Sequence, residues 1–267
     1  IVFAPLTRGL KGVSLSANWM WPCKNEGEDA RLYRAVRAAS DFAVALGINI
    51  PTGKDSLSMT QKYKDGELVY APGTVIITSP AEVSDVKGCV SPVLRQAASQ
   101  IVYVDMSRCD FELGGSAFAQ IVGKVGRTAP SIADAGYFAR AFEAVQALVK
   151  SGRVLAGHDV SGGGLITALL EMTFGDNRSG MDLRLDVLGE TDIIRLLFSE
   201  KPALLLQVAD AEAVCAELAA AGVDAWTVGE VNRRREFTVE ACGVQFALLQ
   251  DHLRDLWFKS SYLLDRR

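Results

Sequence analysis

Residues 154–174, VLAGHDVSGGGLITALLEMTF, decide how the second half of this chain folds. Val154–Ala156 is a short apolar run that predicts a strand, and the apolar spacing of Leu165–Phe174 predicts a helix. Between them lie three consecutive glycines, Gly162–Gly164, which predict a turn. The chain therefore places a polar, glycine-rich turn between two elements that are expected to be buried.

The residues of this turn suit a magnesium-bound phosphate. A carboxylate at the end of a strand, here Asp159, can hold Mg2+, a hard cation that prefers oxygen ligands and keeps several waters. Glycines let backbone N–H groups approach an anion, and the start of a helix favours negative charge. Asp159 and Ser161 are two residues apart, so an extended backbone turns both to one side. The alternative is a flexible turn in which Asp159 or Ser161 caps the helix.

A second polar stretch is Ile50–Met59 (IPTGKDSLSM), in which residues 51–59 are predicted to be a loop. It is not a phosphate-binding P-loop, because that pattern requires glycine where Ile48 stands and Ser or Thr where Asp55 stands. Lys54, Asp55 and the neighbouring hydroxyls could line a polar cleft, and a solvated loop is an equal alternative.

Other segments carry weaker signals. Adjacent glycines in Leu113–Gln120 (LGGSAFAQ) permit a close backbone approach to a ligand or a strand, or tight helix packing. Neither His158 nor His252 is placed beside a particular cysteine or serine, so nucleophilic hydrolysis has little support. His158 could be an acid/base group or a hydrogen-bonded histidine. Arg233–Glu236 (RRRE) is predicted to be a solvated hairpin turn.

Helices and strands mix without a strict βαβ repeat, which predicts an α+β fold. Helices are expected over 27–46, 133–150, 165–174, 211–221 and 251–258, the last followed by a polar tail. Strands are expected over 48–50, 74–77, 101–104, 154–156, 203–208, 226–231 and 237–240. The turn-rich passage over 80–98 is the expected domain boundary.

Composition excludes several classes of protein. The 267 residues are 49% hydrophobic and 22% charged, which is enough apolar material for a sizeable core. The net charge of -4 provides no broad basic face for nucleic acid, and no apolar run of about 18 residues predicts a membrane span. Five cysteines without CxxC spacing predict reduced thiols in a cytoplasmic protein. The start at Ile1, without methionine, suggests a piece of a longer chain or a processed terminus.

Six segments together carry a resemblance to a known family. They are SLSANWM (14–20), GEDARLY (27–33), IPTGKDSLSM (50–59), LGGSAFAQ (113–120), AGHDVSGGGL (156–165) and LLFSEKPALLLQV (196–208). In this order they resemble the second half of the synthetase region in the large, single-chain phosphoribosylformylglycinamidine synthases. The resemblance covers essentially the whole chain, including SSYLLDRR (260–267), and six ordered segments are far more specific than any one.

The resemblance implies a fold like that of aminoimidazole ribonucleotide synthetase. Residues 1–90 would be part of an N-terminal-type subdomain and residues 91–247 a complete C-terminal-type subdomain. Residues 248–267 would form a helix and linker toward a glutaminase domain. The enzyme it implies converts formylglycinamide ribonucleotide, glutamine and ATP into the formylglycinamidine, glutamate, ADP and phosphate in purine biosynthesis.

The resemblance also implies roles for individual residues. Asp159 falls on the family's magnesium ligand and Ser161 on its nucleotide-binding serine, while Gly163, Lys54 and Asp55 are further nucleotide-binding candidates. The family's other metal ligands, spaced ExxxN, are expected before Ile1, its glutaminase residues beyond Arg267, and its first synthetase half elsewhere. No catalytic residue is therefore expected in this chain, and the isolated piece is expected to be inactive.

One departure and two alternatives stay open. Gly162 stands where many members have aspartate, which removes a carboxylate from the turn. The chain could belong to another enzyme of the superfamily, such as aminoimidazole ribonucleotide synthetase, selenophosphate synthetase or thiamine-phosphate kinase. It could also be a scaffold that binds magnesium and ATP or ADP without turning the nucleotide over.

Overall fold

The structure is a computed structural model that describes residues 1–176 and 178–266. These residues divide into two compact units: Ile1 with Leu6–Ser84, and Val2–Pro5 with the chain from Asp85 onward. All five cysteines are free thiols. No helix in the described ranges is both long and apolar enough to cross a membrane.

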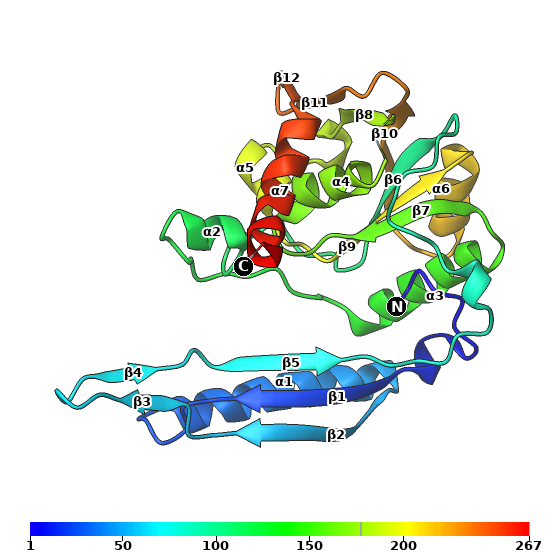
Figure 1. The fold of residues 1–267 in the computed structure, drawn as a ribbon. Helices are drawn as coiled ribbons and strands as arrows, with labels where there is room; N and C mark the ends of the chain where they lie inside the picture. The colour runs from blue at the N-terminus through cyan, green and yellow to red at the C-terminus, as the bar shows by residue number, and fades with distance from the viewer. Residues whose placement is uncertain (177, 267) are drawn as a thin grey trace. The chain divides into compact units, whose positions relative to one another are not determined.

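The first unit is a three-stranded sheet that carries one long helix (Figure 1). The strand order is β2–β1–β5, with β1 parallel to β2 and antiparallel to β5. A short antiparallel hairpin, β3–β4, connects β2 to β5. The elements are η1 Gly9–Gly12, β1 Ser14–Met20, α1 Glu28–Leu46, β2 Asn49–Ser56, β3 Thr60–Lys62, β4 Leu68–Tyr70 and β5 Thr74–Thr78.

Helix α1 confirms the helix expected over 27–46. The negative charges of Glu28 and Asp29 in its first turn stabilise the helix, because they lie at the positive end of the helix dipole. Gly47 ends the helix in the left-handed conformation (φ 68°), and its N–H donates to the carbonyl oxygens of the last turn. One face of the helix carries Leu32, Ala35 and Ala39. This face packs against Ala17 and Trp19 of β1 and against Trp21, which follows the strand.

The prediction of a loop over residues 51–59 is wrong for most of its length, because β2 runs from Asn49 to Ser56. The polar residues Thr52–Ser56 pair in register with β1, with Lys54 opposite Asn18. Most of β2 is exposed, so the strand has no alternation of buried and exposed residues to read in the sequence. Main-chain pairing with β1 makes it a strand.

The second unit is built on a seven-stranded sheet in the order β12–β11–β8–β10–β6–β9–β7. All neighbouring strands are antiparallel except β8 and β11. The strands are β6 Gln100–Asp105, β7 Val154–Asp159, β8 Gly180–Arg184, β9 Ala203–Val208, β10 Ala225–Asn232, β11 Phe237–Ala241 and β12 Val244–Leu248. The predicted α+β class is confirmed.

Helices pack on both faces of this sheet. Ile101 and Tyr103 of β6 belong to a core with α4 and α5, whereas Val102 and Val104, equally buried, point to the opposite face. Helix α6 contacts β6 and β10. The helices are η2 Val86–Gly88, α2 Ala117–Ile121, α3 Ala135–Lys150, α4 Gly164–Phe174, η3 Asp186–Leu188, α5 Ile193–Phe198, α6 Ala211–Ala220 and α7 Gln250–Asp265.

Two expectations for the second unit are wrong. Helix α7 continues to Asp265, so residues 259–265 are helical and not a polar tail. Arg233–Glu236 does not form a hairpin turn, because β8 lies between β10 and β11. Arg235 in this connection is held by Asp251 and by the carbonyl oxygen of Asp176 at 2.6 Å. Sheet assembly, which joins strands distant in sequence, determines the second of these outcomes.

Candidate functional site

The glycine-rich turn follows β7, an edge strand paired with β9. Backbone pairing extends one residue beyond the strand, where the Val160 N–H donates to Ala203 at 2.9 Å. The chain then reverses: the Gly164 N–H donates to the Ser161 carbonyl at 2.9 Å, and α4 begins. Gly163 (φ 90°) and Gly164 (φ 76°) have left-handed backbone, a region that favours glycine. The predicted strand, turn and helix are all present.

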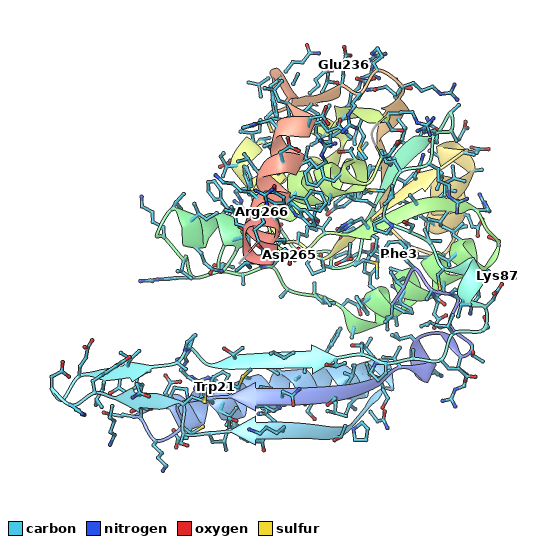
Figure 2. The ribbon with its side chains drawn as sticks, in the orientation of Figure 1. Phe3, Trp21, Lys87, Glu236, Asp265 and Arg266 are labelled. Carbon is cyan, nitrogen blue, oxygen red and sulfur yellow. The ribbon has the colours of Figure 1, made fainter. Side chains whose placement is uncertain are left out.

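The strand before the turn is positioned by the N-terminal segment of the chain. Phe3, labelled in Figure 2, lies so close to Gly157 that a Cβ atom there would come within 2.1 Å of its ring. The Gly157 N–H donates to Ser91 at 3.1 Å, and Val90 donates to Phe3 at 2.8 Å. Gly157 is therefore needed for packing of β7.

Asp159 and Ser161 are exposed, while Val160 between them is only 8% exposed. This alternation turns both polar side chains to solvent. Within residues 1–176 and 178–266, neither the Asp159 carboxylate nor the Ser161 hydroxyl has a hydrogen bond or ion pair, so neither is a helix cap. Gly163 occupies the N-cap position of α4 without a side-chain cap. Two oxygen groups at the start of a helix therefore have no partner in the part of the chain that the structure describes.

This donor set fits a magnesium ion that is held mainly by waters and phosphate. Mg2+ in nucleotide sites commonly uses one or two protein carboxylates together with phosphate oxygens. Asp159 provides one carboxylate at a strand end. In the described part of the chain no group of three or more His, Cys, Asp or Glu residues could hold a metal by itself. The single carboxylate of Asp159 suits a metal that arrives with a phosphate ligand.

Sequence reasoning missed Glu200, which organises the turn. One oxygen of its carboxylate accepts hydrogen bonds from the Gly163 N–H at 3.1 Å and from the Ala117 N–H at 2.8 Å. It therefore joins the start of α4 to the start of α2, where a negative charge is favoured. Its only local signal is its place between the apolar elements α5 and β9. Its partners lie 37 and 83 residues away in the sequence.

The LGGSAFAQ segment uses its glycines against another part of the backbone. A Cβ atom at Gly114 would lie 2.2 Å from the Thr128 carbonyl oxygen, to which the Gly114 N–H donates. Ser116 caps α2 through its hydroxyl, which accepts from Ala119. Ser199 donates to the Glu112 carbonyl at 2.8 Å. The close approach expected for these glycines is made to the chain near Thr128.

Both ring nitrogens of His158 lie close to oxygen atoms. Its Nδ1 lies 2.7 Å from the Asp159 carbonyl oxygen, and its Nε2 lies 3.3 Å from Glu171 on α4. The ring is only 17% exposed. Of the two readings left open by the sequence, the structure therefore supports the hydrogen-bonded histidine. Glu171 was also missed, because it is one acidic residue within an apolar helix.

Lys54 and Asp55 lie on β2 of the first unit, opposite Asn18 and Trp19 of β1. Both side chains are exposed. The Lys54 ammonium donates to the Ser56 hydroxyl on the same strand. As consecutive strand residues, Lys54 and Asp55 face opposite sides of the sheet. The structure brings Asp159, Ser161 and Gly163 together on one turn, and describes Lys54 and Asp55 within the other unit.

Gly162 departs from the expected pattern for no steric reason. A Cβ atom at this position meets nothing within 4 Å, in contrast to Gly163 and Gly164, and its φ is not positive. The turn would accept a Cβ atom here without moving its backbone.

Comparison with known proteins identifies both parts of the chain. The family model for the FGAR-AT PurM_N-like domain matches residues 1–82, and the model for the AIR synthase related protein, C-terminal domain, matches residues 106–242. The second match covers slightly more than half of the chain.

Two curated relatives match the chain along its whole length. It is 36% identical over 271 residues to a probable phosphoribosylformylglycinamidine synthase, chloroplastic/mitochondrial, of Arabidopsis thaliana, and 35% identical over 275 residues to phosphoribosylformylglycinamidine synthase of Homo sapiens. Each match covers 100% of this chain but only 19% and 20% of the respective relative. The chain therefore spans about a fifth of the length of these relatives.

Solved structures show the same fold. T. maritima PurL complexed with ATP matches with a TM-score of 0.66 at 14% sequence identity, covering 95% of this chain and 38% of PurL. The expected likeness to aminoimidazole ribonucleotide synthetase and to the synthase family is confirmed. The chain consists of an FGAR-AT PurM_N-like segment followed by an AIR synthase related C-terminal domain, and it belongs to the AIR synthase related family.

Proposed function

We propose that this chain is part of a phosphoribosylformylglycinamidine synthase, an ATP-dependent ligase that forms a C–N bond. Whole-length similarity to two relatives of that name supports the proposal. In the proposed reaction the amide oxygen of formylglycinamide ribonucleotide takes the terminal phosphoryl group of ATP, and ADP leaves. Ammonia released from glutamine then attacks the activated carbon, and phosphate leaves. Formylglycinamidine ribonucleotide and glutamate are the other products.

The part of this function assigned to the chain is binding of a magnesium nucleotide. The observation that carries it is the pair of exposed oxygen groups, Asp159 and Ser161, which have no partner among the described residues and stand before the left-handed glycines of the turn. Asp159 would be a ligand of Mg2+, and the Ser161 hydroxyl would donate to a phosphate oxygen. When bound, the metal would neutralise phosphate charge. The Gly163 N–H already donates to Glu200, so it contributes less.

Replacement of Asp159 tests this assignment. In the complete enzyme, Asp159→Asn keeps the size of the side chain but removes its charge. We expect binding of Mg·ADP to weaken roughly 10–100-fold, the range found when groups that support a metal are removed. Titration calorimetry with Mg·ADP, and analysis of nucleotide retained after purification, measure the effect.

A matched control is Asp41→Asn, which changes another exposed carboxylate, on α1. It should leave Mg·ADP affinity within about twofold. Unchanged affinity in Asp159→Asn would remove Asp159 from the site. Equal losses in both variants would indicate a general effect of charge.

A second prediction concerns the chain by itself. We expect no amidine formation from the 267-residue chain with saturating ATP, formylglycinamide ribonucleotide and ammonia. The physical reason is that the described residues offer one carboxylate and one hydroxyl at the turn and no cluster able to hold a metal alone. Coupled detection of ADP, with product identified by mass, measures turnover. Clear turnover would show that this chain contains a complete active site.

A scaffold role is the second candidate, in which bound nucleotide stabilises the enzyme and is not hydrolysed. The turn carries one exposed carboxylate, Asp159, and one exposed hydroxyl, Ser161, and so small a polar set favours binding without hydrolysis. Labelled ADP that stays bound through many turnovers would support the scaffold, and exchange in every cycle would support catalysis.

The free state of all five thiols also supports the expected cytoplasmic, reducing location.

A further inference from the structure

Glu171 joins three elements of the second unit. It lies on α4, and its side chain is 24% exposed. One carboxylate oxygen lies 3.3 Å from Nε2 of His158, at the end of β7. The other accepts a hydrogen bond of 3.0 Å from the indole N–H of Trp257 on α7. A single carboxylate therefore connects β7, α4 and the last described helix of the chain.

The contact with His158 reaches the backbone of Asp159. The second ring nitrogen of His158, Nδ1, lies 2.7 Å from the Asp159 carbonyl oxygen. Both nitrogens of a ring that is 17% exposed are thus held by oxygen atoms, which restricts rotation of the ring. The series Asp159, His158, Glu171 and Trp257 is a continuous path of polar contacts from the turn to α7.

The contact with Trp257 is a large part of how the middle of α7 is attached. The indole ring is 52% exposed, so burial alone holds it weakly. It packs against Phe174 at the end of α4, with ring centroids 5.9 Å apart. The first turn of α7 has separate anchors: Gln250 donates to the Ser179 carbonyl, and Asp251 pairs with Arg235. Loss of the Glu171 bond would therefore loosen the middle of α7 and leave its first turn in place.

We propose that Glu171 is a positioning residue for the magnesium-nucleotide turn, and that through it the docking of α7 and the binding of nucleotide at Asp159 strengthen each other. This inference rests on the proposed function, because it takes Asp159 as the metal ligand. Coupling between two sites is reciprocal: if attached α7 raises nucleotide affinity by some factor, bound nucleotide favours attachment of α7 by the same factor.

The test compares Mg·ADP binding in the complete enzyme and its variants at a temperature well below unfolding. Glu171→Ala removes both contacts, and we expect affinity to fall about fivefold or more, the lower range for coupled sites. Glu171→Gln keeps an acceptor for Trp257 and an amide that can donate to His158, so it should stay within about twofold of wild type. Trp257→Phe keeps a ring against Phe174 but removes the N–H, and should lose affinity in the same direction as Glu171→Ala.

Fluorescence provides a readout that a purely structural role would not change. The emission spectrum of Trp257 is obtained by subtracting the spectrum of Trp257→Phe from that of the wild type. It should shift when Mg·ADP is added, and Glu171→Ala should abolish that shift. Asp251→Asn is the matched control, because it removes the charge from the Arg235 contact of the same helix without touching Glu171. Its affinity and emission shift should match wild type.

The outcomes separate this inference from the proposed function. If Asp159→Asn binds Mg·ADP as wild type does, the metal assignment fails, and the inference fails with it. If Asp159→Asn loses affinity but Glu171→Ala and Trp257→Phe do not, only the role of Glu171 is overturned. A loss in Asp251→Asn equal to that in Glu171→Ala also overturns it, because any loosening of α7 would then suffice. If Glu171→Ala does not fold, Trp257→Phe and Glu171→Gln still decide the question.

Discussion

Replacement of Lys201 by alanine should lower the free energy of unfolding of the second unit by about 3–5 kcal/mol, the cost of leaving a buried charge without its partner. The Lys201 ammonium lies 2.8 Å from the Asp105 carboxylate, and these side chains are only 9% and 6% exposed. The ammonium also lies 4.7 Å from the centre of the Phe111 ring. Without Lys201, the Asp105 charge would remain in a site that water barely reaches.

The hydrogen bonds of the other Asp105 oxygen make it possible to remove the charge of this residue and keep its role as an acceptor. It accepts from the Ser107 N–H at 2.8 Å, from the Ser107 hydroxyl at 3.0 Å and from the Arg108 N–H at 3.0 Å. Asparagine can keep these bonds through its amide oxygen. The double variant Lys201→Met with Asp105→Asn removes both charges and keeps the acceptor. We expect it to recover most of the stability lost in Lys201→Ala.

Denaturant unfolding followed by the signal of the second unit measures these differences, and the single variants Lys201→Met and Asp105→Asn complete a double-mutant cycle with the double variant. Arg184→Ala is the control, because the Arg184–Glu240 pair is 3.9 Å apart and both side chains are mostly exposed. Its cost should stay below about 1 kcal/mol. A loss in Lys201→Ala no larger than that of the control would contradict the importance of the buried pair.

Replacement of Gly164 by alanine should cost about 2–5 kcal/mol, combining left-handed backbone strain with overpacking. Its φ of 76° disfavours any L side chain, and the added Cβ would lie 2.6 Å from the Phe198 carbonyl carbon and 2.7 Å from the Leu197 oxygen. Those atoms belong to the backbone of α5, which cannot move aside as a flexible side chain can. The same variant should lose Mg·ADP binding, because α4 starts at this residue.

Gly162→Ala is the matched control for this prediction. The new methyl group meets nothing within 4 Å, and the φ of Gly162 is not positive. Its stability should change by no more than about 0.5 kcal/mol. Thermal unfolding of the two variants under one buffer condition makes the comparison. Equal melting temperatures would show that the turn adapts to a side chain at Gly164 and that the described close approach is not a constraint.

Much of the second unit could be predicted from local sequence. The strand at 203–208, the helix at 211–221 and the turn at His158–Gly164 each carry their signal within about ten residues, as apolar spacing or as glycines. Helix α3 was expected from 133 and begins at Ala135, since Asp134 caps it through its side chain. Asp159 and Ser161 were chosen for the same local reason, because a carboxylate and a hydroxyl stand between a strand and a glycine turn.

Other features depend on partners that the local sequence does not reveal. The polar residues of strand β2 predict a loop, whereas pairing with β1 makes the segment a strand. Arg233–Glu236 has the composition of a hairpin turn between consecutive strands, but β8 lies between β10 and β11. In both cases the deciding hydrogen bonds come from backbone groups, which are the same in every residue apart from proline.

The sequence by itself determined the α+β class, the glycine-rich turn and the two oxygen groups exposed on it, since strand, turn and helix preferences act between near neighbours. Only the tertiary structure decided what holds that turn in place. Glu200 reaches Gly163 and Ala117, and Glu171 reaches His158 and Trp257. A carboxylate accepts from any suitably placed N–H group, so its partner is chosen by the packing of the sheet and helices that brings distant segments together.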